Sequence, residues 1–105
     1  MYNFLTCWDV YERISFLQRV ILIHSYLYYM LDETLWTDKK YDEIAKQLAE
    51  MQENVTQVEL VNSADYGYVF YDYDGTTGFD LYYRLNEKDK KRIEQIARTI
   101  VGGNR

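Results

Sequence analysis

Hydrophobic positions in the first third of the chain follow a helical period. Within a predicted helix from about Trp8 to Leu31, residues on one stripe recur in steps of three and four from Val10 onward, and a second apolar stripe runs beside it. A helix that is apolar over more than half of its circumference must be covered on several sides. We therefore expect a long helix here, with Thr6 as its cap, that forms the centre of the core. Its second stripe is available for a homodimer contact.

A second helix is predicted over residues 38–53, after a corner at residues 32–36. Thr37 supplies a capping hydroxyl, and Asp38 places a negative charge in the first turn, where it suits the helix dipole. The residues expected on its buried face are Tyr41, Ile44, Ala45, Leu48 and Met51.

The period changes in the second half of the chain. Residues 66–72 and 79–85 alternate with a period of two around Asp74-Gly75, which predicts an antiparallel hairpin, and residues 57–62 are expected to add a third strand. The expected buried face consists of Tyr68, Phe70, Phe79, Leu81, Tyr83 and Leu85.

A C-terminal helix follows, capped by Asn86 and stopped by Gly102. Its expected inner stripe consists of Ile93, Ile96, Ala97, Ile100 and Val101. The predicted fold class is α+β in a single domain, with a helical pair in residues 1–54 and a hairpin plus helix in residues 55–105.

Composition narrows the classes of function. The chain has 105 residues and a formal net charge of −5, so its surface repels nucleic-acid phosphates and favours a basic protein partner. One cysteine, Cys7, excludes an internal disulfide and indicates a reducing compartment. The longest apolar stretch, residues 20–31, is too short for a membrane span and carries His24. We expect a cytoplasmic protein, in a bacterial cell or a phage-infected host.

No catalytic or metal site is predicted. The single histidine, His24, falls on the apolar stripe of the first helix, where a core role is favoured over a general base. One histidine and one cysteine are too few for a transition-metal site, and the acidic residues near Asp74-Gly75 lack EF-hand spacing.

The corner between the first two helices gathers aromatic and acidic residues that core packing alone does not require. Stacking faces of tyrosine rings and carboxylate acceptors would converge there if the helices pack side by side, and together they suit a small aromatic group that carries positive charge or hydroxyls. The residues of this candidate site are Tyr28, Tyr29, Asp38, Tyr41 and Asp42.

The order H-x-Y-x-Y-Y-x-x-D-x(5)-D-x-x-Y-D-x(5)-L, from His24 to Leu48, resembles the small N-terminal helical domain of bacterial NAD-dependent DNA ligases. The resemblance covers residues 18–50 and implies that the five residues of the candidate site contact the nicotinamide mononucleotide half of NAD. Two positions depart from the family pattern, because Tyr29 stands where a histidine is common and Thr34 where a proline is common.

The ligase chemistry itself is missing from the sequence. Ligases of this family transfer AMP through the lysine of a K-x-D-G motif, whereas here the Asp-Gly pair at Asp74-Gly75 has Asp72 in the lysine position. The resemblance therefore implies a non-catalytic binding protein that requires no cofactor, with nicotinamide mononucleotide or NAD as its ligand. The other interpretation of the corner is that its residues only hold the two helices together.

A protein-binding function is the alternative. The outward face of the predicted hairpin and its turn are aromatic and acidic, which suits contact with a basic surface. Short acidic proteins of phage type inhibit nucleic-acid-handling or defence enzymes in this way, as anti-CRISPR proteins do, and a subunit of a replication or repair assembly is a third hypothesis. The candidate partner-binding residues are Tyr71, Asp72, Asp74, Asp80 and Tyr82.

Overall fold

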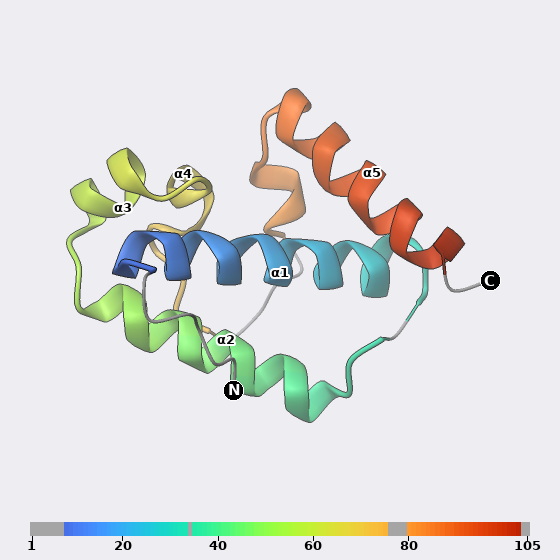
Figure 1. Ribbon diagram of the computed structural model, residues 1–105, viewed down its shortest axis with the longest axis horizontal. Helices are drawn as coiled ribbons and strands as arrows, with labels where there is room; N and C mark the ends of the chain where they lie inside the picture. Colours follow the sequence, from blue (N-terminus) through green and yellow to red (C-terminus); the bar gives the residue numbers. More distant parts are fainter. Residues whose placement is uncertain (1–7, 34, 76–79, 104–105) are drawn as a thin grey trace.

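The computed structural model of the protein describes residues 8–33, 35–75 and 80–103. Its longest element is helix α1 (Val10–Met30), which runs through the middle of the molecule in Figure 1. Helix α2 (Asp38–Glu53) returns along one side of α1, and helix α5 (Glu87–Gly103) crosses the other side. The prediction that the first helix forms the centre of the core is confirmed, because α1 packs against both of the other long helices.

The cap of α1 differs from the prediction. Asp9 is the N-cap, its side chain accepts a hydrogen bond from the Glu12 backbone N–H, and the Glu12 carboxylate accepts in return from the Asp9 N–H. This reciprocal capping box satisfies two of the free amides at the helix start. The predicted cap, Thr6, and the cysteine, Cys7, lie outside the described residues.

Helix α2 begins and ends where the sequence predicts. The Thr37 hydroxyl accepts from the Lys40 N–H at 3.1 Å, so it caps the helix as expected. Ile44, Ala45 and Leu48 are buried against α1, while Tyr41 and Met51 are half-buried beside them.

The second half of the chain corrects the predicted fold class. The described residues contain no β-strand, so the α+β prediction with its hairpin and third strand is wrong and the described chain is helical. Residues 57–62 lie in helix α3 (Gln57–Ser63), and residues 66–72 form a turn and the short helix α4 (Gly67–Phe70). Residues 80–85 form a turn and the 3-10 helix η1 (Tyr82–Arg84), and Phe79 lies outside the described residues.

Burial in these segments shows why the strand pattern misled. In α3 only Leu60 is buried, Val58 is 69% exposed, and the Thr56 hydroxyl caps the helix by accepting from the Glu59 N–H. Phe70, Leu81 and Leu85 are buried as predicted. Tyr68 and Tyr83 are exposed, however, and Val69 is fully buried, so burial does not alternate along these segments. A short stretch of mixed apolar and polar residues fits the period of a helix as well as that of a strand, so tertiary packing decides which of the two forms.

The segments that were expected to pair as strands do meet, but through side chains. Arg84 Nη1 donates to the Val69 carbonyl oxygen at 3.3 Å and to Asp72 Oδ1 at 2.8 Å. The Tyr68 hydroxyl donates to Asp89 Oδ2 at 2.5 Å and accepts from the Asn86 N–H at 3.2 Å. These bonds hold α4 against η1 and the start of α5 without any backbone ladder.

Helix α5 has the cap and inner stripe that the sequence predicts. Asn86 Oδ1 accepts from the Asp89 N–H at 2.8 Å, and Ile93 and Ala97 are fully buried. The helix continues through Gly102 to Gly103, so the predicted stop at Gly102 is one residue early.

A buried amide pair joins three parts of the molecule. Gln18 Nε2 on α1 donates to Gln52 Oε1 on α2 at 3.1 Å, and Gln52 Nε2 donates to the Phe70 carbonyl oxygen at 2.8 Å. Gln18 Oε1 also accepts from the Tyr66 N–H at 3.1 Å. Buried amides are stable only when their hydrogen-bonding groups are paired, so this network fixes the α3–α4 segment onto the helical pair.

Candidate functional site

The corner that joins α1 to α2 is shaped by backbone contacts at the end of α1. Asp32 has a φ of 53°, a left-handed conformation that aspartate tolerates better than most residues, and the Glu33 N–H donates to the Leu27 carbonyl oxygen at 2.9 Å. The chain thus turns sharply after α1 and enters α2 at the Thr37 cap. This turn brings the last turns of α1 beside the first turns of α2.

A hydroxyl pair connects the two helices at this corner. Ser25 Oγ on α1 and the Tyr41 hydroxyl on α2 lie 2.8 Å apart, within hydrogen-bonding distance. Burial raises the pKa of Tyr41, and the nearby Tyr29 and Asp42 raise it further, whereas the bond to Ser25 lowers it. Tyr41, Tyr29 and Asp42 are therefore neighbours, and the Tyr41 phenol stays protonated at neutral pH.

The remaining predicted site residues are exposed at the same corner. Tyr28 and Tyr29 are 49% and 45% exposed, and their rings meet edge to face with centroids 4.8 Å apart. Asp38 and Asp42 are exposed in the first two turns of α2. The structure thus places aromatic faces and carboxylates around one corner, where Tyr41 is half-buried.

His24 of α1 stacks on Trp36, which lies in the loop between α1 and α2. The two rings are nearly parallel, with centroids 3.6 Å apart, and Lys40 Nζ lies 5.1 Å from the centroid of the Trp36 ring. Burial lowers the pKa of His24 to about 4, and the positive charge of Lys40 acts in the same direction. His24 is therefore neutral at pH 7. The sequence did not assign a role to Trp36, because a single aromatic residue in a loop carries no periodic signal.

Tyr73 is a second residue near the corner that the sequence did not identify. Its hydroxyl is buried and has no hydrogen-bond partner among the residues that the structure describes. Burial raises the pKa of Tyr73, and Tyr41, Asp74, Asp42 and Tyr29 add to this effect. No short-range pattern links residue 73 to residues 29–42, so only the tertiary structure shows this proximity.

The candidate partner-binding residues do not form one face of a hairpin. Asp72 and Asp80 both pair with Arg84, at 2.8 and 3.2 Å. Tyr82 is half-buried, its ring lies 5.1 Å from that of Tyr26, and Lys90 Nζ approaches it to 5.9 Å. Tyr71 and Asp74 are exposed. A partner surface at these residues stays a prediction, and the flat strand face on which it was based is absent from the described residues.

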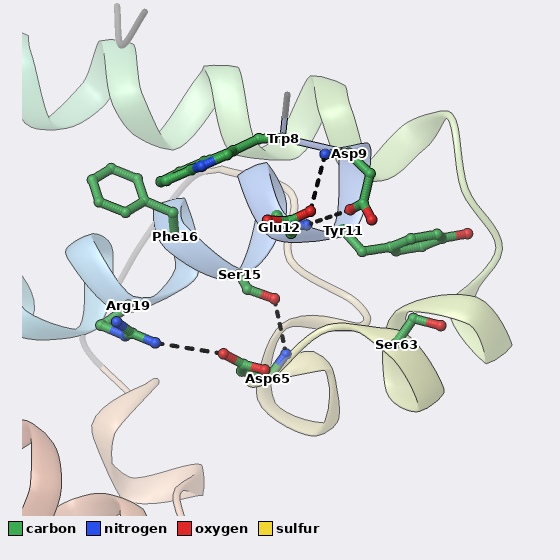
Figure 2. A pocket seen from close by; sticks show the side chains of 9 residues that line it. All are labelled: Trp8, Asp9, Tyr11, Glu12, Ser15, Phe16, Arg19, Ser63 and Asp65. Atoms are coloured by element: carbon green, nitrogen blue, oxygen red, sulfur yellow. Dashed lines mark hydrogen bonds and ion pairs between the residues drawn. The ribbon is translucent and has the colours of Figure 1, made fainter. Parts of the chain in front are cut away.

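A separate cavity of about 500 Å³ lies at the other end of α1 (Figure 2). Trp8 and Phe16 form one wall, edge to face with centroids 5.5 Å apart. The opposite wall carries Asp65, whose carboxylate is 3.5 Å from Arg19 Nη2 and whose backbone N–H donates to Ser15 Oγ at 3.0 Å. The cavity shares no residue with the candidate corner.

Residues 8–33, 35–75 and 80–103 hold neither a metal-binding cluster nor a membrane span. Within these ranges, no group of three or more histidine, cysteine, aspartate or glutamate side chains is arranged to hold a metal ion. No helix in the same ranges is long and apolar enough to cross a membrane.

Comparison with known proteins places the corner inside a matching segment. The family model for the DNA ligase-like, N-terminal NAD+-binding domain matches residues 8–65, which include α1, the corner, α2 and α3. A DNA ligase from Anoxybacillus flavithermus (strain DSM 21510 / WK1) is 36% identical over 55 residues, which make up 52% of this chain and 8% of that ligase. No solved structure was found to match the chain. Since the family model covers more than half of its residues, the chain belongs to the family of DNA ligase-like, N-terminal NAD+-binding domains.

Proposed function

We propose that the protein binds the nicotinamide mononucleotide portion of NAD, or free nicotinamide mononucleotide, at the corner between α1 and α2. The observation that carries this proposal is the clustering of five residues at one corner, inside the segment that matches the NAD+-binding family. These residues are Tyr28, Tyr29, Asp38, Tyr41 and Asp42.

The chemistry of the corner suits the ligand. The nicotinamide ring in these nucleotides is a flat pyridinium cation, and tyrosine faces attract such rings by stacking and by cation–π interaction. Asp38 and Asp42 add carboxylates that accept hydrogen bonds from ribose hydroxyls and favour the positive ring. Lys40, in the first turn of α2, adds a cation for the phosphate of the ligand.

The substitution at Tyr29 defines how this corner differs from the family pattern. A phenol keeps the stacking face of the common histidine, but it offers a hydroxyl in place of the imidazole nitrogens and carries no positive charge. We therefore expect the affinity for NAD, whose diphosphate does not titrate in this range, to change little between pH 6 and 8. His24 does not introduce a titration in this range, because its pKa is lowered to about 4.

We propose a binding role without catalysis for the residues of this chain. The DNA ligase from Anoxybacillus flavithermus matches this chain over a segment that is 8% of the length of that ligase. The position that corresponds to the lysine of K-x-D-G is occupied by Asp72. The corner supplies aromatic faces and acceptors for a ligand, and its five residues include no lysine of the kind through which ligases transfer AMP.

Calorimetric titration with nicotinamide mononucleotide, NAD and ADP-ribose tests the proposal. We expect micromolar binding of the first two ligands and no binding of ADP-ribose, which lacks the nicotinamide ring. Tyr28→Ala and Asp42→Asn should each weaken binding about tenfold or more, the size of one lost stacking or charged contact.

Two matched control variants distinguish the loss of a site residue from the loss of any exposed ring or carboxylate. Tyr71→Ala removes a ring of similar exposure (43%) next to α4, and Glu50→Gln removes an exposed carboxylate two turns further along α2. Both variants should bind like the wild type. If the wild-type protein releases no heat with any of these nucleotides, and its melting temperature does not rise with them, the proposal fails.

A further inference from the structure

The segment after α4 runs along α2 toward the candidate corner. Its start is fixed where Gln52 Nε2 donates to the Phe70 carbonyl oxygen at 2.8 Å. Further along, a Cβ at Gly75 would lie 3.3 Å from both the Ala45 carbonyl oxygen and Ala49 Cβ, so this backbone touches α2 directly. Residues 52, 49 and 45 are spaced by three and four positions and form one face of α2, and the next position on that face is Asp42.

Tyr73 lies within this segment and is held in place by local contacts. Its N–H donates to the Phe70 carbonyl oxygen at 3.0 Å, and its ring meets the Phe70 ring edge to face at 5.1 Å. The Tyr73 hydroxyl is buried and has no hydrogen-bond partner within the described ranges. A buried hydroxyl that donates to nothing destabilises a protein, so such a group requires an explanation.

The surroundings of this hydroxyl are those of the nucleotide corner. Tyr41, Asp42 and Tyr29 all lie close enough to raise the pKa of Tyr73, although burial is the larger cause. The hydroxyl is thus a protonated donor beside three residues of the candidate site. It comes from outside residues 8–65, the segment that matches the ligase-like family.

We propose that the Tyr73 hydroxyl is a further ligand-binding group that donates a hydrogen bond to the carboxamide oxygen of a bound nicotinamide ring, an inference that rests on the function proposed above. Tyrosine rings provide the stacking surfaces of the corner, so the ring of the ligand and its carboxamide lie among them. Asp42 and Asp74 make an anionic acceptor, such as a phosphate, unfavourable at this position. Because the hydroxyl is buried in the protein without ligand, this contact requires the side chains around it to move when the ligand binds.

Tyr73→Phe removes the hydroxyl and keeps the ring. We expect the variant to bind nicotinamide mononucleotide about three- to tenfold more weakly than the wild type, the effect of one neutral hydrogen bond. Its melting temperature without ligand should be equal or higher, because an unpaired buried polar atom is removed. Tyr71→Phe is the matched control, since it makes the same change two residues away on an exposed ring and should change neither quantity.

A second ligand identifies the acceptor. The pyridine mononucleotide that lacks the carboxamide should bind the wild type and Tyr73→Phe equally. If Tyr73→Phe loses the same affinity for both ligands, the assignment to the carboxamide is overturned.

Unchanged affinity of Tyr73→Phe for nicotinamide mononucleotide would overturn this inference and leave the proposed function intact. A weaker affinity together with a lower melting temperature would assign Tyr73 to the fold and also overturn it. A wild-type protein that does not bind nicotinamide mononucleotide would overturn both.

Discussion

At the scale of single residues, the corner shows which side chains the sequence could identify. Tyr28, Asp38 and Asp42 were recognisable because their order along two helices resembles a known family. The His24–Trp36 stack was not, since it depends on how the loop folds back on α1. The buried hydroxyl of Tyr73 was also hidden, because it is supplied by a segment more than 30 positions away in the sequence.

The stacked histidine makes the stability of the protein depend on pH. The pKa of His24 is lowered to about 4 in the folded protein and is about 6.5 in the unfolded chain, so the unfolded state binds the proton more tightly. Stability from this residue is complete above pH 6.5 and decreases as the pH falls toward 4. Since the ring is only half-buried, we expect a loss of about 1–2 kcal/mol in the free energy of unfolding.

His24→Phe tests this dependence, because it keeps a flat ring against Trp36 and removes the titration. Urea unfolding at pH 7 and pH 4.5 should show a smaller decrease for the variant than for the wild type. Carboxylates titrate in both proteins and cancel in the comparison. Parallel decreases in the two proteins would contradict the prediction.

At the scale of elements, the sequence predicted a helix correctly where a capping residue was followed by apolar residues at helical spacing. Thr37 and Asn86 both cap their helices as expected, and the inner stripe of α5 is buried through Ile93 and Ala97. The hairpin failed because residues 66–72 and 80–85 are held by side chains, chiefly Arg84 and Tyr68, and a sequence pattern does not encode such contacts. The helix α3 was missed because its seven residues expose Val58 and bury only Leu60.

The packing of α4 on α3 requires a glycine. A Cβ at Gly67 would lie 1.8 Å from the Leu60 carbonyl oxygen, closer than any two such atoms can approach. Gly67→Ala should therefore separate α3 from α4 and lower the free energy of unfolding by about 3 kcal/mol. Chemical denaturation monitored by circular dichroism measures this loss.

Gly102→Ala is the control for the same substitution. No atom lies within 4 Å of a Cβ at this position near the end of α5. Alanine is the better helix former, so this variant should be more stable by up to about 0.5 kcal/mol. If Gly67→Ala and Gly102→Ala change the free energy of unfolding equally, the close contact between α3 and α4 does not contribute to stability.

At the scale of the whole molecule, one hydrophobic cluster contains residues from both halves of the chain. Leu17 and Ile21 of α1 pack in it with Leu48 of α2 and Ile93 of α5. The buried Gln18–Gln52 pair adds polar links between α1, α2 and α4. A shared core of this kind favours a single cooperative unfolding transition, and the single-domain prediction can be tested on that basis.

The two tryptophans report from opposite ends of α1. Trp8 lies beside Phe16 near its start, and Trp36 stacks on His24 near its end. Trp36→Phe leaves Trp8 as the single tryptophan, and Trp8→Phe leaves Trp36. In each variant, the midpoint of thermal unfolding measured by tryptophan fluorescence should agree with the midpoint measured by far-ultraviolet circular dichroism to within about 2 °C. A separate, earlier transition for Trp8 would show that the region around α3 and α4 unfolds on its own.

The hydrogen bond between Ser25 and Tyr41 has a consequence for the order of events during protein synthesis. It spans 16 residues, whereas the Gln18–Tyr66 bond spans 48 and the Arg98–Tyr26 bond spans 72. Contacts between residues close in sequence form soonest, and a chain emerging from the ribosome folds from its N-terminal end. The corner can therefore assemble once α2 has emerged, while α5, which covers the other side of α1, is still being translated. A nucleotide that binds the corner would then stabilise the growing chain before its core is complete.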